Sequence, residues 1–341
     1  MKSYTNILEE LDKNQYRWLI TGVAGFIGSN ILEKLLNLNQ IVVGIDNFCT
    51  GHQSNLDDVT SKFEKSFIED NFTFINGDIV DLQLCKKSSE GIDVILHQAA
   101  LGSIPRSISD PISTHDANVN GFLNMLIAAK ENKVRRFVYA SSSAVYGDHP
   151  DLPKIEENIG RPLNPYAITK LINELYARNF SDLYEYRTIG LRYFNVFGFR
   201  QDPDGAYAAV IPKWIDSLIK GEQIYINGDG ETSRDFCFIE NAVQANLLAA
   251  MTDNDGALNQ IYNVAVNQQT TLNQLYEIIS HEINDAKIEK PIYRDFRKGD
   301  IRHSCADISK AGELLGYSPT DYVKDGLQKT IKWYIENESK N

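Results

Sequence analysis

The chain has 341 residues, 43% of them hydrophobic, and its 46 acidic and 34 basic side chains give a formal net charge of −12. This length supplies enough apolar material for a large core and predicts two domains. The acidic balance argues against a broad surface for nucleic acid or for an anionic membrane, so neither is expected as a partner.

Metal and disulfide chemistry are not expected either. The four cysteines lack CxxC spacing and the six histidines form no ligand cluster, which predicts no metal and fits a reducing cytoplasm. No apolar run approaches membrane-spanning length, and the N-terminus lacks the apolar core of a signal peptide. A short amphipathic helix, with Ile7, Leu8 and Leu11 on one face, is instead expected within the first 17 residues.

A glycine-rich turn follows the first apolar run, residues 18–20. It reads Thr21-Gly22-Val23-Ala24-Gly25-Phe26-Ile27-Gly28, and residues 29–38 then carry apolar side chains at helical spacing. Gly22 and Gly25 let backbone N–H groups approach a pyrophosphate at the helix N-terminus, where the helix dipole favours an anion. Gly28 lets the helix pack closely on the strand. The spacing is Gly-x-x-Gly-x-x-Gly, where Gly-x-Gly-x-x-Gly is commoner.

An acidic residue ends the second apolar run, residues 41–45. The Asp46 carboxylate at this strand tip suits the adenosine ribose hydroxyls of a dinucleotide and repels a 2′-phosphate. The sequence therefore favours NAD over NADP as the cofactor.

Strands and helices alternate through the first half of the chain. Further strands are expected at 72–75, 94–97, 137–140 and 187–193, with helical patterns between them, as at 121–127. This alternation predicts an α/β fold of the Rossmann type, a doubly wound parallel sheet with helices on both faces. Ligands bind such sheets beyond the carboxyl ends of the strands. The residues expected to share that crevice are Asp78-Ile79, Gln98-Ala99-Ala100, Ser141 to Ser143 and Asn195.

The pattern becomes irregular after residue 195. Short strands are expected at 223–226 and 236–239, and helices around 240–252, 271–283 and 323–338. We interpret this half as a smaller mixed α/β substrate lobe, interleaved with late elements of the first domain. The expected boundaries are 1–195 plus about 236–264 for the NAD-binding domain, and 196–235 plus about 265–341 for the lobe.

A tyrosine and a lysine four residues apart, Tyr166 and Lys170, follow the serine triplet. An unperturbed phenol has a pKa near ~10, so Tyr166 needs help to act as a base. An ammonium one helical turn away, together with the positive nicotinamide of NAD⁺, is expected to favour the phenolate. Ser143 is expected to hydrogen-bond a substrate hydroxyl and orient its proton, with help from Ser142.

Several segments together resemble the extended short-chain dehydrogenase/reductase family and, within it, the UDP-hexose 4-epimerases. The closest resemblance is to bacterial UDP-N-acetylglucosamine 4-epimerases of surface-polysaccharide synthesis. The likeness runs from about residue 17 to the C-terminus. The segments that carry it are Thr21 to Gly28, Asp46-Asn47, His97 to Ala100, Ser141 to Gly147, Tyr166-x-x-x-Lys170, Arg192 to Gly198, Arg234-Asp235-Phe236 and Arg297-Lys298-Gly299-Asp300.

The resemblance implies an NAD-dependent isomerase with Tyr166, Lys170, Ser143 and Ser142 as catalytic residues. The residues implied in cofactor binding are Gly22, Gly25, Phe26, Ile27, Gly28, Asp46, Asn47, Asp78, Ile79, Gln98, Ala99, Ala100, Asn118, Tyr166, Lys170 and Tyr193. The residues implied in substrate binding are Ser103, Ser142, Ser143, Tyr166, Asn195, Ala209, Val210, Tyr225, Ile226, Asn227, Arg234, Arg297, Asp300 and Ser304. Arginines suit the diphosphate because a guanidinium donates two parallel hydrogen bonds.

The implied reaction inverts C4 of a UDP-sugar through a transient 4-keto sugar, while NAD stays bound. Related dehydratases carry a carboxylate after the active-site Ser or Thr, whereas Ala144-Val145 follows Ser143 here, which favours epimerisation. Ser304 occupies the family position that lines the sugar pocket. A small residue there leaves room for a 2-acetamido group, which Ser103 is placed to hydrogen-bond. UDP-N-acetylglucosamine and UDP-N-acetylgalactosamine are therefore favoured as substrates.

Four alternatives stay open. Unsubstituted UDP-glucose fits the same pocket, and a UDP-uronic acid would call on Arg106 as the cation that faces C6. A decarboxylase or dehydratase of the same family is disfavoured by Ala144-Val145. A non-catalytic scaffold that senses NAD would have no use for a base such as Tyr166. The resemblance also implies a homodimer, formed through a face that includes helix 164–181.

Overall fold

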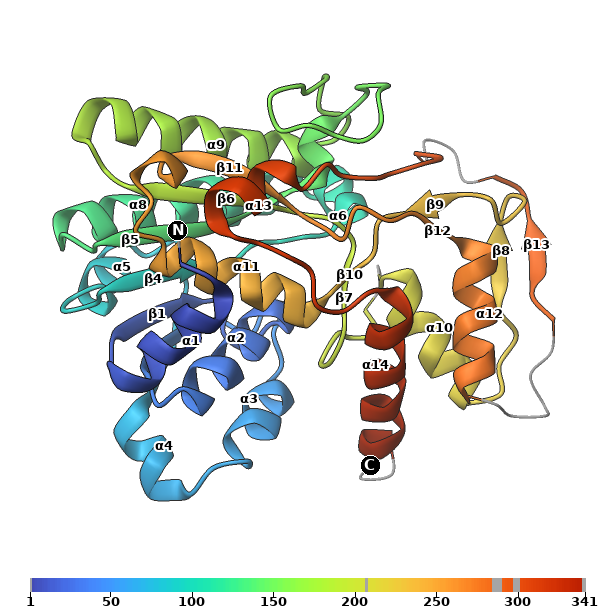
Figure 1. Ribbon diagram of the computed structural model, residues 1–341, viewed down its shortest axis with the longest axis horizontal. Coiled ribbons are helices and arrows are strands. Elements are labelled where there is room, and N and C mark those ends of the chain that lie inside the picture. Colours follow the sequence, from blue (N-terminus) through green and yellow to red (C-terminus); the bar gives the residue numbers. More distant parts are fainter. Residues whose placement is uncertain (1, 206–207, 284–289, 297–300, 339–341) are drawn as a thin grey trace.

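The computed structural model describes residues 2–205, 208–283, 290–296 and 301–338 (Figure 1). Its centre is a seven-stranded sheet in the order β11-β6-β5-β4-β1-β2-β3, in which every neighbouring pair is parallel. The predicted doubly wound Rossmann-type fold is therefore confirmed. The strands are β1 (Arg17–Thr21), β2 (Ile41–Asp46), β3 (Phe72–Asn76), β4 (Val94–His97), β5 (Arg136–Ser142), β6 (Thr188–Tyr193) and β11 (Gln260–Val264).

Helices cover both faces of this sheet because successive side chains of a strand point to opposite faces. In β1, Ile20 joins the core under α1 (Tyr4–Lys13), α2 (Phe26–Asn37) and α11 (Ile239–Met251). Its neighbour Leu19 joins a separate core under α5 (Leu82–Ser88), α8 (Gly121–Glu131) and α9 (Pro165–Tyr184). Figure 1 shows α8 and α9 on one side of the sheet, and α2 and α11 on the other. Shorter helices connect these elements: α3 (Gln53–Thr60), α4 (Lys65–Asn71), α6 (Ile104–Ser109) and α7 (Pro111–His115).

The predicted N-terminal helix is present as α1. The Ser3 hydroxyl accepts a hydrogen bond from the Asn6 amide and caps its first turn. Ile7 and Leu11 are buried, and Leu8 packs beside them at the edge of the core. The helix thus covers apolar surface next to α11.

One strand of the sheet was not predicted. Strand β11 pairs in parallel with β6, and it contains Gln260 and Asn263 among its apolar residues. Asn263 is fully buried, and the polar atoms of its side chain all have partners. Its side chain donates to the Lys154 and Asp307 carbonyls and accepts from the Tyr146 hydroxyl. These polar residues interrupt the apolar run by which the other strands are found.

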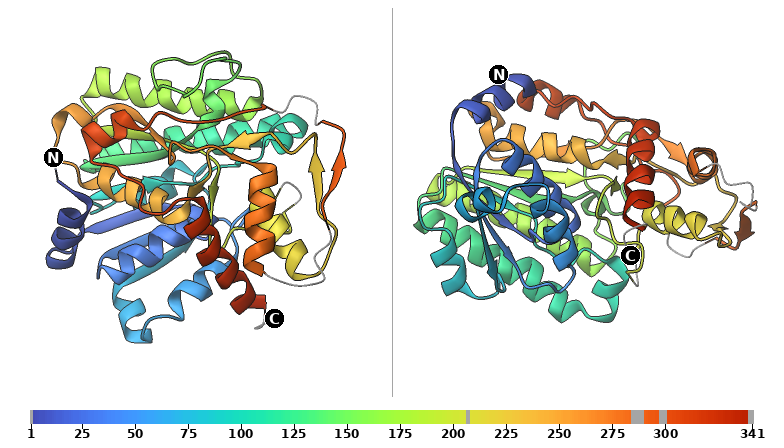
Figure 2. Two further views of the ribbon diagram at one scale, coloured as in Figure 1. Left: turned by 45° about the vertical axis from the view of Figure 1, so that its right-hand side comes forward. Right: turned by 90° about the horizontal axis from the view of Figure 1, so that it is seen from below.

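The smaller lobe lies at one end of the sheet (Figure 2). Its helices are α10 (Val210–Ile219), α12 (Leu272–Ile283) and α14 (Val323–Glu338). Its two short strand pairs are β8 (Tyr225–Asn227) with β13 (Ile292–Arg294), and β9 (Ser233–Arg234) with β12 (Thr270–Thr271). The expected strand 236–239 is only β10 (Cys237–Phe238), which pairs with β7 (Val196–Phe197), because α11 begins at Ile239. Helix α13 (Ser309–Leu315) contacts β11 and α11 on the sheet side, although the expected boundaries put residues 309–315 in the lobe.

Among the described residues, no helix combines the length and apolar character needed to cross a bilayer. All four cysteines are free thiols.

Candidate active site

The glycine turn has the backbone geometry that a bound pyrophosphate needs. Gly22 has a φ of +71°, and a Cβ there would lie 2.8 Å from the Ala99 nitrogen. A Cβ at Gly28 would lie 2.1 Å from the Gly22 carbonyl oxygen, so only glycine allows α2 to pack this closely on the turn. Gly25 is the N-cap of α2 and contributes no side-chain hydrogen bond. The first N–H groups of α2 are therefore open to an anion, and the loop fits a dinucleotide.

Asp46 stands beside this turn at the end of β2, as the sequence predicts. Its two carboxylate oxygens accept hydrogen bonds from the Ala24 and Phe48 amides at 2.9 and 2.8 Å. Burial raises the pKa of Asp46, and these N–H donors lower it in part. Next to it, the Asn47 amide donates to the Asp78 carboxylate at 2.8 Å, so the ends of β2 and β3 meet. The three polar residues thus lie together at the adenosine end of the predicted cofactor groove.

A closed triangle of hydrogen bonds lies between the ends of β4 and β6. Tyr193 donates to Gln98 at 3.1 Å, Gln98 donates to Asn246 at 3.0 Å, and Asn246 donates to the Tyr193 hydroxyl at 2.8 Å. Gln98 and Tyr193 were predicted cofactor residues, whereas Asn246, fully buried in α11, was missed. Helix α11 carries two other buried amides, Asn241 and Gln244, so Asn246 did not stand out in the sequence.

The tyrosine and the lysine lie on the first turns of α9. The Asn164 side chain accepts from the Ala167 amide at 2.9 Å and Pro165 is the first helical residue, so the helix starts just before Tyr166. Lys170 is buried, and its ammonium donates to the Ala140 carbonyl in β5 at 2.8 Å. Burial lowers the pKa of Lys170 to about 8, although the charge of Glu174 raises it.

Lys170 was expected to lower the pKa of Tyr166, but in the protein without a ligand the pKa of Tyr166 is raised. Burial raises the pKa of Tyr166, and a hydrogen bond with Ser142 lowers it only in part. The reason is geometric: the Lys170 ammonium donates to the Ala140 carbonyl. An acidic phenol therefore depends on a further positive charge close to Tyr166, of the kind that the nicotinamide of NAD⁺ carries.

The three serines at the end of β5 have different surroundings. Ser141 is buried, and its hydroxyl donates to the Glu174 carboxylate at 2.5 Å. Ser142 accepts from the Ala144 amide at 3.1 Å and caps the short 3-10 helix Ser143–Tyr146. Ser142 and Ser143 are both partly exposed. All three were expected to share the crevice, but the burial of Ser141 leaves only Ser142 and Ser143 with exposed surface.

Asn118 holds the loop after β4 against α9. It lies in a π-helical turn, Asp116–Asn120, and its amide donates to the Leu101 carbonyl and to the Thr169 hydroxyl. Its carbonyl oxygen accepts from the Leu101 amide at 2.7 Å. Its side chain therefore supports the residue before Lys170, and a direct contact with the cofactor stays a prediction.

A cavity of about 830 Å³ separates the sheet from the lobe. Of the predicted substrate residues, its lining contains Asn195, Ala209, Val210, Tyr225, Asn227 and Arg234. The sequence did not single out the lining residues Trp214 and Arg294, and the Arg294 guanidinium lies 3.3 Å from the centre of the Tyr225 ring. This cation–aromatic pair forms a flat wall on the cavity. The cavity has the size and the mixed lining that a sugar nucleotide needs.

The other predicted substrate residues lie elsewhere. The Ile226 side chain is fully buried in the core, so only its backbone can face a ligand. The Ser103 hydroxyl caps α6 by accepting from the Arg106 amide at 3.1 Å. The Ser304 amide donates to the Ser233 carbonyl, beside Arg234. The part of the 830 Å³ cavity's lining that the structure describes does not include Ser103 or Ser304. It also does not include the predicted catalytic residues Ser142, Ser143, Tyr166 and Lys170. Arg297 and Asp300 lie outside the described residues.

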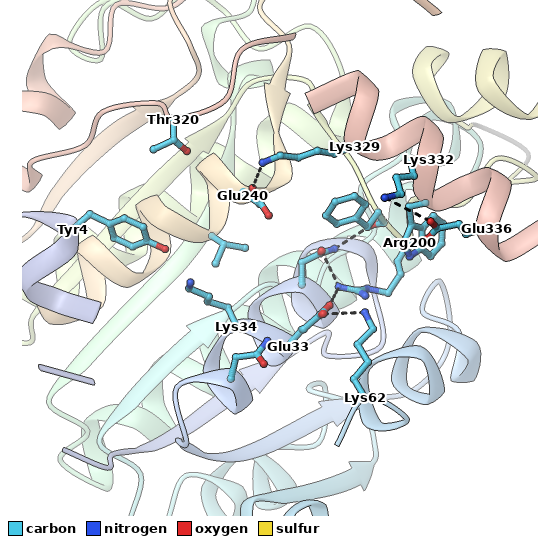
Figure 3. Close-up of a pocket in the computed structure, with 15 residues that line it drawn as sticks. Tyr4, Glu33, Lys34, Lys62, Arg200, Glu240, Thr320, Lys329, Lys332 and Glu336 are labelled. Atoms are coloured by element: carbon cyan, nitrogen blue, oxygen red, sulfur yellow. Dashed lines mark hydrogen bonds and ion pairs between the residues drawn. The ribbon is translucent and has the colours of Figure 1, made fainter. Parts of the chain in front are cut away.

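A second cavity, of about 610 Å³, lies between α1, α2, α11 and α14 (Figure 3). Its charged residues mostly pair with each other. Lys62 meets Glu33 at 2.9 Å, and Lys329 meets Glu240 at 2.8 Å. Arg200, buried at its floor, meets the same Glu33 at 2.7 Å and joins the lobe to α2. Because these charges neutralise each other, and because the lining of the 830 Å³ cavity contains six of the predicted substrate residues, the 830 Å³ cavity is the better substrate site.

Comparison with known proteins identifies the family. Residues 18–265 match the model of the NAD dependent epimerase/dehydratase family, and the chain belongs to this family. A putative UDP-glucose 4-epimerase from Methanocaldococcus jannaschii is 36% identical, with 94% of this chain and 98% of the relative covered.

Two solved structures also match. A UDP-N-acetylglucosamine 4-epimerase from Methanobrevibacter ruminantium, in complex with UDP-N-acetylmuramic acid, is 38% identical with a TM-score of 0.87, covering 95% of this chain and 99% of that chain. A UDP-glucuronic acid 4-epimerase variant from Bacillus cereus, in complex with NAD and a fluorinated UDP-glucuronic acid, is 28% identical with a TM-score of 0.84, covering 94% and 99%. These relatives share one enzyme class, the NAD-dependent UDP-sugar 4-epimerases, and their names differ in the sugar.

Proposed function

We propose that this NAD-dependent UDP-sugar 4-epimerase interconverts UDP-N-acetylglucosamine and UDP-N-acetylgalactosamine. The observation that carries the catalytic part is the arrangement around β5. Tyr166 and Lys170 lie on α9, which packs against β5, and Lys170 is bonded to that strand at Ala140. Strand β5 ends at Ser142, and Ser143 follows it. The NAD loop lies two strands away, at the same edge of the sheet.

In the proposed cycle one proton and one hydride leave the sugar and later return to it. Tyr166 accepts the proton of the sugar O4 as the C4–H bond breaks, and Ser143 holds that oxygen in place. NAD⁺, when held by the glycine turn and Asp46, would supply the hydride acceptor and donor. Between the two transfers the 4-keto sugar turns over, and Tyr166 then gives its proton back to O4. The protein therefore ends each cycle with every group in its starting state, and no added cofactor is consumed.

The 830 Å³ cavity is proposed to hold UDP while the sugar turns. Arg234 lines it from β9 and Asn195 from the end of the sheet, and Tyr225 with Arg294 forms the flat wall. Arginine forks suit a diphosphate, and a flat aromatic face suits a base. Arg297 and Asp300 are further candidates by resemblance. Strong binding of UDP and weak binding of the sugar is the combination that this reaction requires.

The choice of sugar rests on Ser304, which is proposed to leave space for a 2-acetamido group. Unsubstituted UDP-glucose would fit the same space. A uronic acid would need a cation near C6, and Arg106, in the first turns of α6, is the candidate. The 38% identical UDP-N-acetylglucosamine 4-epimerase supports the acetamido sugar.

A bulkier residue at position 304 tests this choice. We expect Ser304→Tyr to lower kcat/KM for UDP-N-acetylglucosamine by at least about 10-fold, because the ring fills the space for the acetamido group, whereas UDP-glucose should lose less than about 3-fold. Ser304→Ala is the control, since it keeps the space. Initial rates measured by NMR on both sugars decide it. Equal losses on both substrates in Ser304→Tyr would remove Ser304 as the gate.

A homodimer through α9 is the second proposal. Helix α9 carries exposed apolar residues at positions seven apart, Ile168 and Leu175, and Ile112 of the adjacent α7 is 74% exposed. Such a face is costly to leave in water, and two copies of it are self-complementary.

Sedimentation should give twice the mass of the chain, and Leu175→Glu should convert the dimer to a monomer. Ile292→Glu changes another exposed apolar residue, on the lobe, and should leave the dimer intact. A wild-type monomer at micromolar concentration would end this proposal. A cytoplasmic location is also proposed, because four free cysteines suit a reducing compartment.

A further inference from the structure

A buried carboxylate lies behind the catalytic pair, one helical turn after Lys170. Glu174 is only 4% exposed and forms a two-pronged ion pair with Arg192 of β6, with N–O distances of 2.9 and 2.8 Å. Arg192 also donates to the Glu156 carbonyl at 2.9 Å, and its guanidinium lies over the Tyr146 ring. A fully desolvated pair with this geometry has little freedom to move.

The same carboxylate holds the end of β5. Two successive residues of β5 are each bonded to α9, at positions one turn apart. The Ala140 carbonyl accepts from Lys170 at 2.8 Å, and the Ser141 hydroxyl donates to Glu174 at 2.5 Å. Ser141 is also the cross-strand partner of Arg192. Strands β5 and β6 and helix α9 thus meet at one side chain, immediately before the accessible Ser142.

The charges around this point have opposite effects on Lys170. On α9, Glu174 raises the pKa of Lys170, and burial lowers it to about 8. His97 on β4 also faces Lys170, and its pKa is lowered to about 3 by burial and by the Lys170 charge, so it stays neutral at physiological pH. Tyr139 on β5 feels the charges of Glu174 and Arg192, and burial keeps it neutral. Among the described groups, Glu174 is therefore the anion that favours the charged form of Lys170.

We propose that Glu174 is a positioning residue for the proposed epimerase reaction, fixing the Tyr166–Lys170 turn of α9 against the serine end of β5 and keeping the Lys170 ammonium charged. This inference rests on the proposed roles of Tyr166 and Lys170. It also explains the serine triplet, because Ser141 serves structure while Ser142 and Ser143 face the crevice.

Glu174→Gln tests the proposal, because glutamine keeps the shape and removes the charge. Without the carboxylate the Lys170 pKa falls further, so the ammonium is lost at lower pH. We expect the alkaline limb of the kcat profile to move down by about one pH unit, and kcat at pH 8 to fall about 10-fold or more. The KM for the UDP-sugar and the content of bound NAD should stay within about 2-fold, since glutamine keeps the shape of the side chain and Glu174 is not itself a predicted binding residue.

Glu156→Gln is the matched control. Glu156 is also buried, but its carboxylate accepts from the Asn263 backbone amide in β11 at 2.8 Å, whereas that of Glu174 is bonded to β5. Its pH profile should match that of the wild type even if its melting temperature falls. Superimposable profiles of Glu174→Gln and Glu156→Gln would overturn the proposal.

A second variant covers the case in which Glu174→Gln does not fold. Ser141→Ala leaves the ion pair in place and removes only its bond to β5, and it should lower kcat about 3- to 10-fold at unchanged KM. A wild-type kcat in Ser141→Ala would then reject the positioning role. A wild-type protein inactive on every UDP-sugar would instead contradict the proposed function, which keeps the two failures distinct.

Discussion

Replacing Tyr166 with phenylalanine should lower kcat about 10³-fold while NAD and UDP still bind. The phenol oxygen of Tyr166 is the proposed acceptor of the O4 proton. The neighbouring Ser142 forms a hydrogen bond with this phenol and does not replace it as the base. The ring itself keeps its packing at the start of α9, so the fold should be unaffected. Turnover by NMR and bound NAD by its absorbance after denaturation are the two measurements.

The control for this variant is a second tyrosine on the same helix. Tyr176 lies further along α9 and packs at the edge of the core, so Tyr176→Phe also removes one hydroxyl. It should keep wild-type kcat. Near-normal turnover by Tyr166→Phe would withdraw the base assignment, whatever the control shows.

Adding one methyl group at Gly28 should abolish stable NAD binding. The new Cβ would lie 2.1 Å from the Gly22 carbonyl oxygen and 2.9 Å from the Val23 Cα, and backbone atoms cannot yield as a flexible side chain can. The turn must therefore move away from α2, and the N–H groups that face the pyrophosphate move with it. We expect about 10-fold or greater loss of NAD from the purified protein, and a stability loss of roughly 1–3 kcal/mol.

Gly312→Ala is the matched control, because Gly312 lies inside α13 and its nearest neighbour is the Tyr317 carbonyl oxygen at 3.5 Å. That change should stabilise the helix by up to about 1 kcal/mol and leave NAD in place. A Gly28→Ala protein that copurifies with a full complement of NAD would show that the turn does not form the pyrophosphate site.

The parallel sheet could be predicted because its strands are local signals. Strands β1, β2, β4 and β5 each contain an apolar run of at least three residues, whereas β3 and β6 alternate apolar residues with others, and glycine or an acidic residue marks several of the carboxyl ends. The order and parallel direction of those strands then place Asp46, Gln98 and Ser142 along one edge. The position of these groups follows from the fold class alone.

The residues that were missed depend on contacts between distant segments. Glu174, Asn246 and Asn263 read as ordinary polar residues, and each is buried only because a partner far along the chain satisfies it. The Lys170 ammonium is a similar case. Helical spacing puts it near Tyr166, but its bond to the Ala140 carbonyl could be seen only in the folded chain.

In the proposed reaction one carbon of the sugar, C4, is oxidised and then reduced, with Tyr166 carrying the proton and bound NAD the hydride. The most direct test supplies wild-type protein, without added cofactor, with UDP-N-acetylglucosamine that carries deuterium at C4. We expect UDP-N-acetylgalactosamine that retains the deuterium at C4, because the hydride that leaves is the hydride that returns. An epimerised product with solvent hydrogen at C4 would contradict it, since the carbon would then have exchanged a proton.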